Sequence, residues 1–300
     1  MIVGLAIRKI FLPTILPVLS AGMLMLPVIS FAAGAGQKIE KHFTVKGRPV
    51  VMIQNVADGR IEVKSWKNSE VVVTTTYVPG KVAIEVEQVG DRIDINASSL
   101  VSSSQPHEVE ANFQLMVPEQ TELRLRTQTG LILVEQVSGD MKLQSVAGDV
   151  HLKEVSGYII VKTAGGSLVC TLCSGKLEFT SISGGAQILQ PSLTNVNLMT
   201  TTGNILYDGE FIRTGLYTMN SGRGLVEVRF SGTDSFDLNA QTYRGTVDNQ
   251  AAEFLKPDTH GTKHRFESRF HRGVSGTVGQ GLAKVELSSY SGTIRILKRD

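Results

Sequence analysis

Two cysteines are the residues of this chain with the most distinctive chemistry. Cys170 and Cys173 form a C-x-x-C motif, and the chain of 300 residues contains 2 cysteines in all. A structural zinc site needs further ligands of this kind, and a redox motif needs a strand–helix context that the surrounding sequence does not provide. Two interpretations stay open: buried free thiols that pack as small apolar side chains, and a disulfide, which requires a bend and an oxidising compartment.

Two aspartates follow glycines at an interval of nine residues. Asp140 and Asp149 each come directly after a glycine, and Tyr158 stands where a third aspartate would fall. Calcium-binding nonapeptide solenoids have the same period but separate the aspartate from the glycine by one residue. The pattern therefore favours solvated corner residues, and we predict neither a metal site nor any other cofactor.

The polar positions of the chain do not resemble an active site. Glycoside hydrolysis needs two carboxyl groups that converge on one bond. Between residues 140 and 190 the polar positions mix cations, amides and single acids, as at Lys142, Glu178 and Gln187. The sequence has no nucleophile elbow, phosphate loop or H-E-x-x-H motif. We predict a protein that is not an enzyme, with a polysaccharide-acting enzyme as the alternative.

One segment, HGTKHRFESRFHRG at 260–273, concentrates basic and aromatic residues. Its alternation favours a strand with Phe266 and Phe270 inward and the cations in water. The other interpretation is a patch that binds an anionic glycan, lipopolysaccharide or lipid, built from Lys263, His264, Arg265, Arg269, His271 and Arg272.

The elements that would position these residues are marked by glycines, which recur every nine residues from 130 to 184. When the residue after each glycine is position one, positions two and four are apolar in successive units, as Met141 and Leu143 show. Position seven is apolar too, as at Val146. A period of two is typical of a strand, whereas a glycine every nine residues would weaken a helix. Each unit should be a strand and a corner, where glycine supplies a positive φ.

A single strand of this kind cannot bury its apolar face alone, but stacked copies can. Two units make a coil of 18 residues, and successive coils bring like positions over one another about 4.8 Å apart. We predict an all-β, single-stranded β-solenoid (β-helix-like) with positions two, four and seven inside. The regular nine-residue repeats occupy 130–190, and the stability of the array is expected to be roughly a sum over neighbouring coils.

The sequence on both sides of the regular repeats is also rich in strands. RIEVKSW and EVVVTTTY alternate apolar and polar residues and are separated by the polar turn KNS. After Pro191 the period loosens, but strands with glycine corners continue, and no long helix is predicted. These less regular strands would close the two ends of the array, where a sheet edge would otherwise lie open.

The succession of these motifs resembles the putative-adhesin family of bacterial extracytoplasmic proteins, a domain of unknown function. The similarity runs in order from about 50 to 297 and is carried by DGRIEVKSW, MVPEQTELRLRTQTG, VSGDMKLQSVAGDV, TTGNILYDGE and VGQGLAKVELSSYSGTIRIL. The resemblance implies a strand-rich solenoid and an envelope or surface location, with no catalytic residues to carry over. The chain departs from the family at CTLC and has a longer insertion at about 250–272.

The amino terminus is a separate object. Arg8 and Lys9 precede a nearly uncharged run that ends in small residues at 33–35. This order is typical of a secretory signal, and an uncleaved membrane anchor is the alternative because the run is long. We therefore predict a signal peptide or N-terminal membrane anchor at 1–35 and a solenoid domain at 36–300, exported to the periplasm, the cell surface or the medium.

The balance of charges limits the classes of partner that the protein is expected to bind. A net charge of +2, from 30 basic and 28 acidic residues, provides no field of one sign for nucleic acid. We predict a binding, adhesion or structural module that presents a repetitive face to a glycan or a cell-envelope protein. A membrane would be contacted only through an uncleaved N-terminal segment. A periplasmic scaffold or sensor of envelope stress is a further alternative.

Overall fold

A computed structural model describes residues 36–101, 109–256 and 272–299. The chain divides into two units at residues 34 and 35, and only the second contains described residues. The predicted signal or anchor at 1–35 lies outside them and stays a prediction. Within the described ranges, no helix combines the length and the apolar character that crossing a membrane requires.

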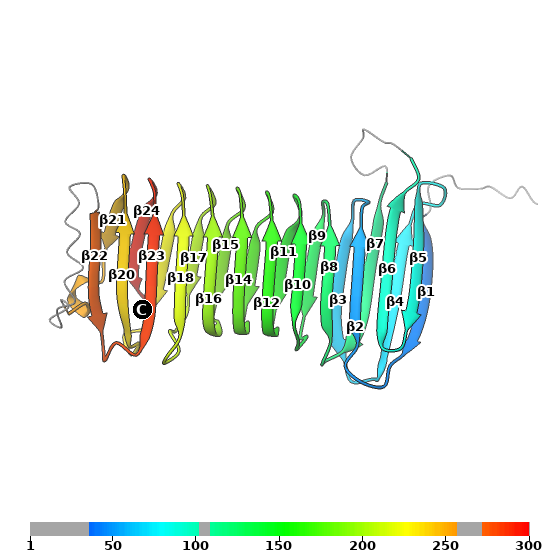
Figure 1. Ribbon diagram of the computed structural model, residues 1–300, viewed down its shortest axis with the longest axis horizontal. Coiled ribbons are helices and arrows are strands. Elements are labelled where there is room, and N and C mark those ends of the chain that lie inside the picture. The colour runs from blue at the N-terminus through cyan, green and yellow to red at the C-terminus, as the bar shows by residue number, and fades with distance from the viewer. Residues whose placement is uncertain (1–35, 102–108, 257–271, 300) are drawn as a thin grey trace, which may run out of the picture. The chain divides into compact units, whose positions relative to one another are not determined.

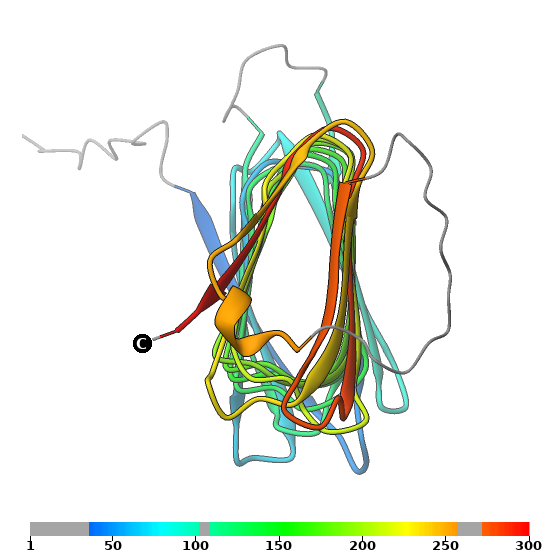
Figure 2. The same ribbon diagram turned by 90° about the vertical axis from the view of Figure 1, so that its left-hand side faces the viewer.

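The second unit consists of two sheets of 12 strands each, which face one another across a single core (Figures 1 and 2). The only other regular element among the described residues is a 3-10 turn, Ala252–Phe254. Sheet A contains, in spatial order, β1 (Gln37–Thr44), β4 (Glu70–Tyr77), β7 (Ala111–Pro118), β3 (Arg60–Trp66), β9 (Leu131–Glu135), β11 (Asp149–Lys153), β13 (Leu168–Thr171), β15 (Ala186–Leu189), β17 (Ile205–Asp208), β19 (Val226–Phe230), β24 (Thr293–Lys298) and β21 (Thr246–Asn249).

Sheet B lies opposite and supplies the other side of each coil. It contains, in spatial order, β22 (Arg272–Val278), β20 (Phe236–Thr242), β23 (Ala283–Ser289), β18 (Leu216–Ser221), β16 (Ser192–Thr200), β14 (Ser174–Ser181), β12 (Ser156–Thr163), β10 (Met141–Ser145), β8 (Glu122–Thr127), β2 (Val50–Asn55), β6 (Arg92–Ser99) and β5 (Val82–Val89).

The predicted coil of 18 residues is confirmed by the strand register. In sheet B, Met141 pairs with Ile159 in parallel, and in sheet A, Leu152 pairs with Cys170 in the same way. Positions two and four are buried in every unit of the regular array, as predicted; their side chains are Met141, Leu143, Val150, Leu152, Ile159, Val161, Leu168, Cys170, Leu177, Phe179, Ala186 and Ile188.

The prediction that position seven always points inward is wrong at every second unit, because the coil has two different corners. Where sheet A leads to sheet B, Val155 is buried, and the preceding Glu154 takes a positive φ of 54° that turns the chain. Where sheet B leads to sheet A, Val146 and Ile182 are 55% and 63% exposed. Consecutive nine-residue units therefore differ, and the true repeat is the whole coil.

At the corner from sheet B to sheet A, a buried serine or threonine hydroxyl occupies the inward position. Ser145 Oγ accepts a hydrogen bond from the Gly148 N–H at 2.7 Å, and Thr163 does the same for Gly166 at 2.7 Å. A buried hydroxyl is thereby satisfied, and it replaces the apolar side chain that the nine-residue pattern predicted. The same contact recurs at Ser181, Thr200, Ser221, Thr242 and Ser289.

The glycines of both corners allow a close approach of consecutive coils, since a Cβ on Gly157 would lie 2.2 Å from the backbone oxygen of Gly139, but their backbone conformations differ. Gly157, near the corner from sheet A to sheet B, has a φ of +124°, as the sequence predicts. Gly148 and Gly166 lie at the other corner and do not have positive φ, which contradicts the prediction there. A Cβ on Gly166 would lie 2.0 Å from the backbone oxygen of Gly148, one coil away. These glycines are required because consecutive coils approach too closely for any side chain.

The order of coils in space departs from the order in sequence at both ends. The last coil, β23 and β24, lies between the coil of β18 and β19 and the coil of β20 and β21 (Figure 1). Near the other end, β6 and β7 lie outside β2 and β3. Three of the four edge strands, β1, β5 and β22, are antiparallel to their neighbours, whereas the fourth, β21, is parallel to β24.

Candidate functional site

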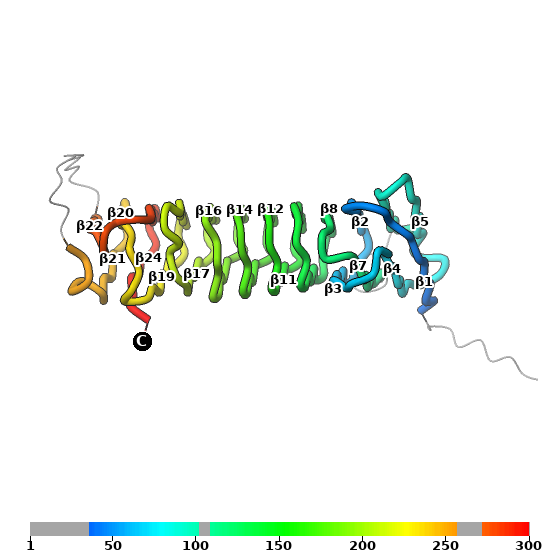
Figure 3. The backbone as a smooth tube through the Cα atoms, turned by 90° about the horizontal axis from the view of Figure 1, so that it is seen from below, coloured from blue at the N-terminus to red at the C-terminus, as the bar shows by residue number. Residues whose placement is uncertain are grey.

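A groove of about 730 Å³ lies on the outer face of sheet B, across β6, β2, β8, β10 and β12. Glu87 of β5 lines one end and Tyr158 of β12 lines the other. Strand β5 stands out beyond the level of the neighbouring strands of its sheet (Figure 3). The hollow therefore follows from the outward displacement of an edge strand at the end of the array.

Alternation along each strand decides which side chains reach the groove. Leu123 and Leu125 of β8 are buried in the core, so Arg124 and Arg126 point outward. The same rule sends Lys142 and Gln144 of β10 to the outer face, because Met141 and Leu143 are buried. The apolar pattern that stacks the coils thus also sets the composition of the groove.

Two of the cations in the groove are neutralised within their own strands. Arg124 forms an ion pair with Glu122 at 2.7 Å, and Arg92 forms one with Asp94 at 2.9 Å. In both cases the partners are two residues apart, so their side chains leave the same face of the strand. These pairs add polarity to the groove but little net charge.

Three cations remain that form no ion pair with any other residue in the described ranges. Arg126 and Lys142 line the groove, and Lys162 continues the row on β12, where it pairs in register with Gln144. All three are exposed. We call Arg126, Lys142 and Lys162 the basic stripe.

Amides accompany Arg126 and Lys162 of the basic stripe, whereas Lys142 lies in register between Arg124 and Ile160. Strand register places Asn96, Gln54, Arg126, Gln144, Lys162 and Thr180 in one row across six strands, and no carboxylate interrupts this row. The acids Glu122 and Asp140 lie nearer the starts of β8 and β10. Tyr158 is 38% exposed and donates a hydrogen bond to Glu178 at 2.6 Å, which raises the pKa of its phenol.

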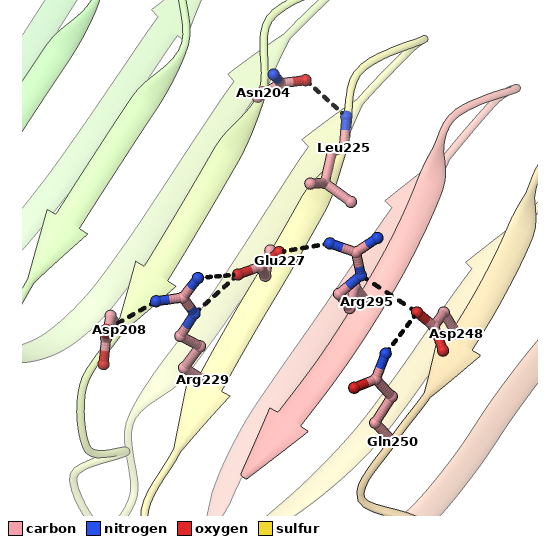
Figure 4. Close-up of polar contacts among 8 residues, drawn as sticks. All are labelled: Asn204, Asp208, Leu225, Glu227, Arg229, Asp248, Gln250 and Arg295. Carbon is pink, nitrogen blue, oxygen red and sulfur yellow. Dashed lines mark hydrogen bonds and ion pairs between the residues drawn. The ribbon is translucent and has the colours of Figure 1, made fainter. Parts of the chain in front are cut away.

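A second polar cluster lies on the outer face of sheet A, near its other end (Figure 4). The Glu227 side chain, only 8% exposed, forms ion pairs with Arg229 at 2.5 Å and Arg295 at 3.1 Å. Arg295 also pairs with Asp248 at 3.2 Å, and these carboxylates raise its pKa, Asp248 foremost through a hydrogen bond. Because each carboxylate is engaged by an arginine, the cluster joins β19, β24 and β21 rather than forming an open site.

Replacement of Glu227 by alanine is expected to lower the free energy of unfolding by about 2 kcal/mol. A larger loss is typical when one partner of a buried ion pair is removed, but here the arginines reach solvent, which reduces the effect. Urea denaturation would measure the change. The control is Glu286→Ala, because Glu286 forms an exposed pair with Lys284 at 3.7 Å and should cost less than about 0.5 kcal/mol. Equal losses would show that the cluster does not join the strands.

The structure describes both cysteines of the C-x-x-C motif but only one residue of the predicted basic patch. Cys170 and Cys173 are joined by a disulfide with Cα atoms 5.9 Å apart, and both are fully buried. Leu172, with a φ of 56°, makes the bend between them. Of the predicted basic patch, Lys263, His264, Arg265, Arg269 and His271 lie outside the described residues, and Arg272 begins β22 as an exposed residue.

The acidic positions do not converge. Asp149 accepts a hydrogen bond from the Ser167 N–H at 2.7 Å, whereas Asp140 lines the groove on the opposite sheet. In the described part of the chain, no group of three or more histidine, cysteine, aspartate or glutamate residues is arranged to hold a metal ion. Residues nine apart lie on opposite faces of the solenoid, so the nine-residue period does not gather them.

The sequence pattern did not predict the groove. Arg126 lies before the regular array, and Lys142 and Lys162 lie on alternate units. An alignment of the sequence with a period of 18 residues places Arg126, Gln144 and Lys162 in one row, because parallel coils superpose them. An alignment with a period of nine does not show that row, because it mixes residues of the two sheets.

The family described as Toastrack DUF4097 matches residues 51–297. This match covers most of the chain and confirms the family resemblance that the succession of strands and glycine corners carries.

Solved structures that match this chain include three bacterial proteins, each at 10% sequence identity. A putative cell adhesion protein from Clostridium sporogenes has a TM-score of 0.29 over 88% of this chain and 100% of its own. A putative adhesin from Bacteroides fragilis has a TM-score of 0.33 over 87% and 97%. A putative lipid binding protein from Parabacteroides distasonis has a TM-score of 0.40 over 89% and 98%. No match is found among curated proteins.

Proposed function

The chain belongs to the Toastrack DUF4097 family, and we propose that it is an exported binding module, not an enzyme, which holds an extended glycan or a cell-envelope protein in the groove of sheet B. The observation that carries this proposal is the register of outward side chains. Parallel coils repeat the same positions about every 4.8 Å across the groove. A ligand that is itself extended and repetitive can make the same kind of contact on each strand.

The composition of the groove supports a polar ligand. Amides such as Gln54 and Gln144 both donate and accept hydrogen bonds, and the groove combines them with ion pairs and unpaired cations. Hydroxyl groups of a sugar or the backbone of an extended peptide are suitable partners for such a surface. Deep burial of the ligand is not required, because many contacts of moderate strength add along the row.

Export is supported by the disulfide between Cys170 and Cys173. Disulfides persist in oxidising compartments and are rare in the cytosol. We propose a location in the periplasm, at the cell surface or in the medium. Cell fractionation with N-terminal sequencing of the recovered protein would test this location. A protein that retains its first residue and stays with the cytosolic fraction would contradict it.

A glycan array and a pull-down of envelope proteins, both with residues 36–300, would test the binding function. We expect selective retention of a ligand, and we expect Gln144→Trp to abolish it, because an indole at Gln144 fills the floor of the groove. The matched control is Gln187→Trp, which places the same side chain on the outer face of sheet A. Absence of any ligand, or equal loss in both variants, would overturn the proposal.

A further inference from the structure

The three cations of the basic stripe form a zigzag across consecutive strands of one orientation. Arg126 on β8 and Lys162 on β12 both pair with Gln144 on β10, so their Cα atoms are two strand spacings apart, about 10 Å. Lys142 lies on the strand between them, displaced two residues along it, or about 7 Å. The cations that form no ion pair with a described residue therefore alternate between two parallel lines, one on each of β8, β10 and β12. Arg124 of β8 lies in register with Lys142 but is neutralised by Glu122.

We infer that the groove binds an acidic polysaccharide with two-fold chain geometry, which runs across the strands and places one carboxylate on each cation. The inference rests on the proposed binding function and specifies the ligand of that site. In an extended two-fold polyuronate each sugar ring is turned over relative to the previous one. Its carboxylates consequently alternate between the two edges of the chain, one for each sugar unit. This alternation matches the positions of Arg126, Lys142 and Lys162.

The stripe has charge available for such a ligand. Its cations form no ion pair with the other described residues, whereas Arg124 and Arg92 are already neutralised by Glu122 and Asp94. A carboxylate that meets an arginine or lysine forms a charge-assisted hydrogen bond, which is stronger than a neutral one. The binding of an acidic chain should therefore depend on these three residues more than on the paired arginines.

Neutral groups beside the stripe suit the rest of a sugar ring. Gln54 and Gln144 lie in the same row as Arg126, where their amides can contact ring hydroxyl groups. Asn96 extends the row by one strand. The groove crosses five strands, from β6 to β12, and β2 and β6 offer positions for further sugar units beyond Arg126, on one side of the three charge contacts.

The same surface suits other polyanions less well. Duplex DNA carries about one charge per 1.7 Å of axis, and the acids Glu87 and Asp140 on the margins of the groove would repel such density. Lipid surfaces are usually bound through exposed apolar anchors together with basic residues. Met52 and Ile160 in the groove are half-buried and do not project as such anchors.

Titration calorimetry with residues 36–300 would test the inference, using β-linked polymannuronate oligosaccharides as the probe. Mannan oligosaccharides of the same lengths would be the neutral comparison. We expect binding of the acidic probe only, weakened by added salt because exposed charges are screened. Affinity should rise with chain length up to about five units, one for each strand of the groove, and then level off.

The triple variant Arg126→Gln/Lys142→Gln/Lys162→Gln should weaken binding about tenfold or more, since three exposed charge contacts are lost. The control Lys41→Gln/Lys67→Gln/Arg213→Gln removes the same charge from exposed sites outside the groove and should bind like the parent protein. Equal weakening of polymannuronate binding in the two triple variants would show that the net charge alone causes the effect, and would overturn the inference.

Two further outcomes distinguish this inference from the function on which it rests. Equal binding of mannan and polymannuronate would overturn the acidic ligand but leave a glycan-binding module. Tighter binding to duplex DNA or to anionic lipid vesicles than to polymannuronate would overturn the assignment to polysaccharide. If no glycan or envelope protein binds in any assay, the proposed function fails together with the inference.

Discussion

The variant Leu143→Asp is expected to unfold the regular array. Leu143 is fully buried, and its register neighbours Leu125 and Val161 are buried above and below it. Loss of a buried leucine side chain alone costs about 2–5 kcal/mol, and an unpaired carboxylate in a dry interior adds a large desolvation penalty. The sum approaches the whole stability of an ordinary domain.

Circular dichroism and thermal melting would measure this effect. The control is Lys142→Asp, one residue earlier, whose side chain is exposed and should change the melting temperature little. A similar melting temperature for both variants would contradict the inward orientation of Leu143 and, with it, the assignment of positions two and four to the core.

The variant Gly166→Ala is expected to be almost as damaging, although it adds only one methyl group. Its Cβ would lie 2.0 Å from the backbone oxygen of Gly148 and 2.5 Å from the adjoining carbon, and backbone cannot move aside as a flexible side chain can. Two coils would have to separate at this corner, with loss of the hydrogen bond between Thr163 and Gly166. We expect a loss of about 4 kcal/mol, typical of the most severe substitutions.

The adjacent glycine provides a matched control. A Cβ on Gly165 would meet nothing closer than 3.7 Å, and Gly165 does not have a positive φ. The variant Gly165→Ala should therefore be close to neutral, or slightly stabilising, because alanine reduces the freedom of the unfolded chain. Chemical denaturation of both variants would compare them. Equal stability of the two would exclude close contact between coils as the reason for the glycine at 166.

The strands and their burial could be predicted from sequence because alternation is a local signal. The segment RIEVKSW corresponds to β3 and EVVVTTTY to β4, and positions two and four fix the core. The two kinds of corner could have been seen as well. Ser145, Thr163 and Ser181 recur every 18 residues, each followed three residues later by glycine, but a nine-residue alignment mixes them with Glu154 and Leu172.

The order of coils and the groove could not be predicted, because they depend on pairing between strands far apart in sequence. Nothing local in β2 indicates that it pairs with both β6 and β8. Likewise, nothing in β23 indicates that it lies between β18 and β20. Gln54 and Arg126 therefore lie side by side in the groove because the N-terminal coils do not follow chain order. The outward displacement of β5 has no sequence signal.

The reversed strands at the two edges of sheet B have a consequence for assembly. A pile of identical parallel coils could in principle continue from one molecule into the next and grow into a filament, because each open edge would be a template for another copy. The edge strands β5 and β22 of sheet B run against the array. At the β1 edge of sheet A, the charges of Lys38, Glu40 and Lys41 discourage a partner strand. Each end of the array thus has a reversed edge strand in sheet B, which opposes growth into a fibre.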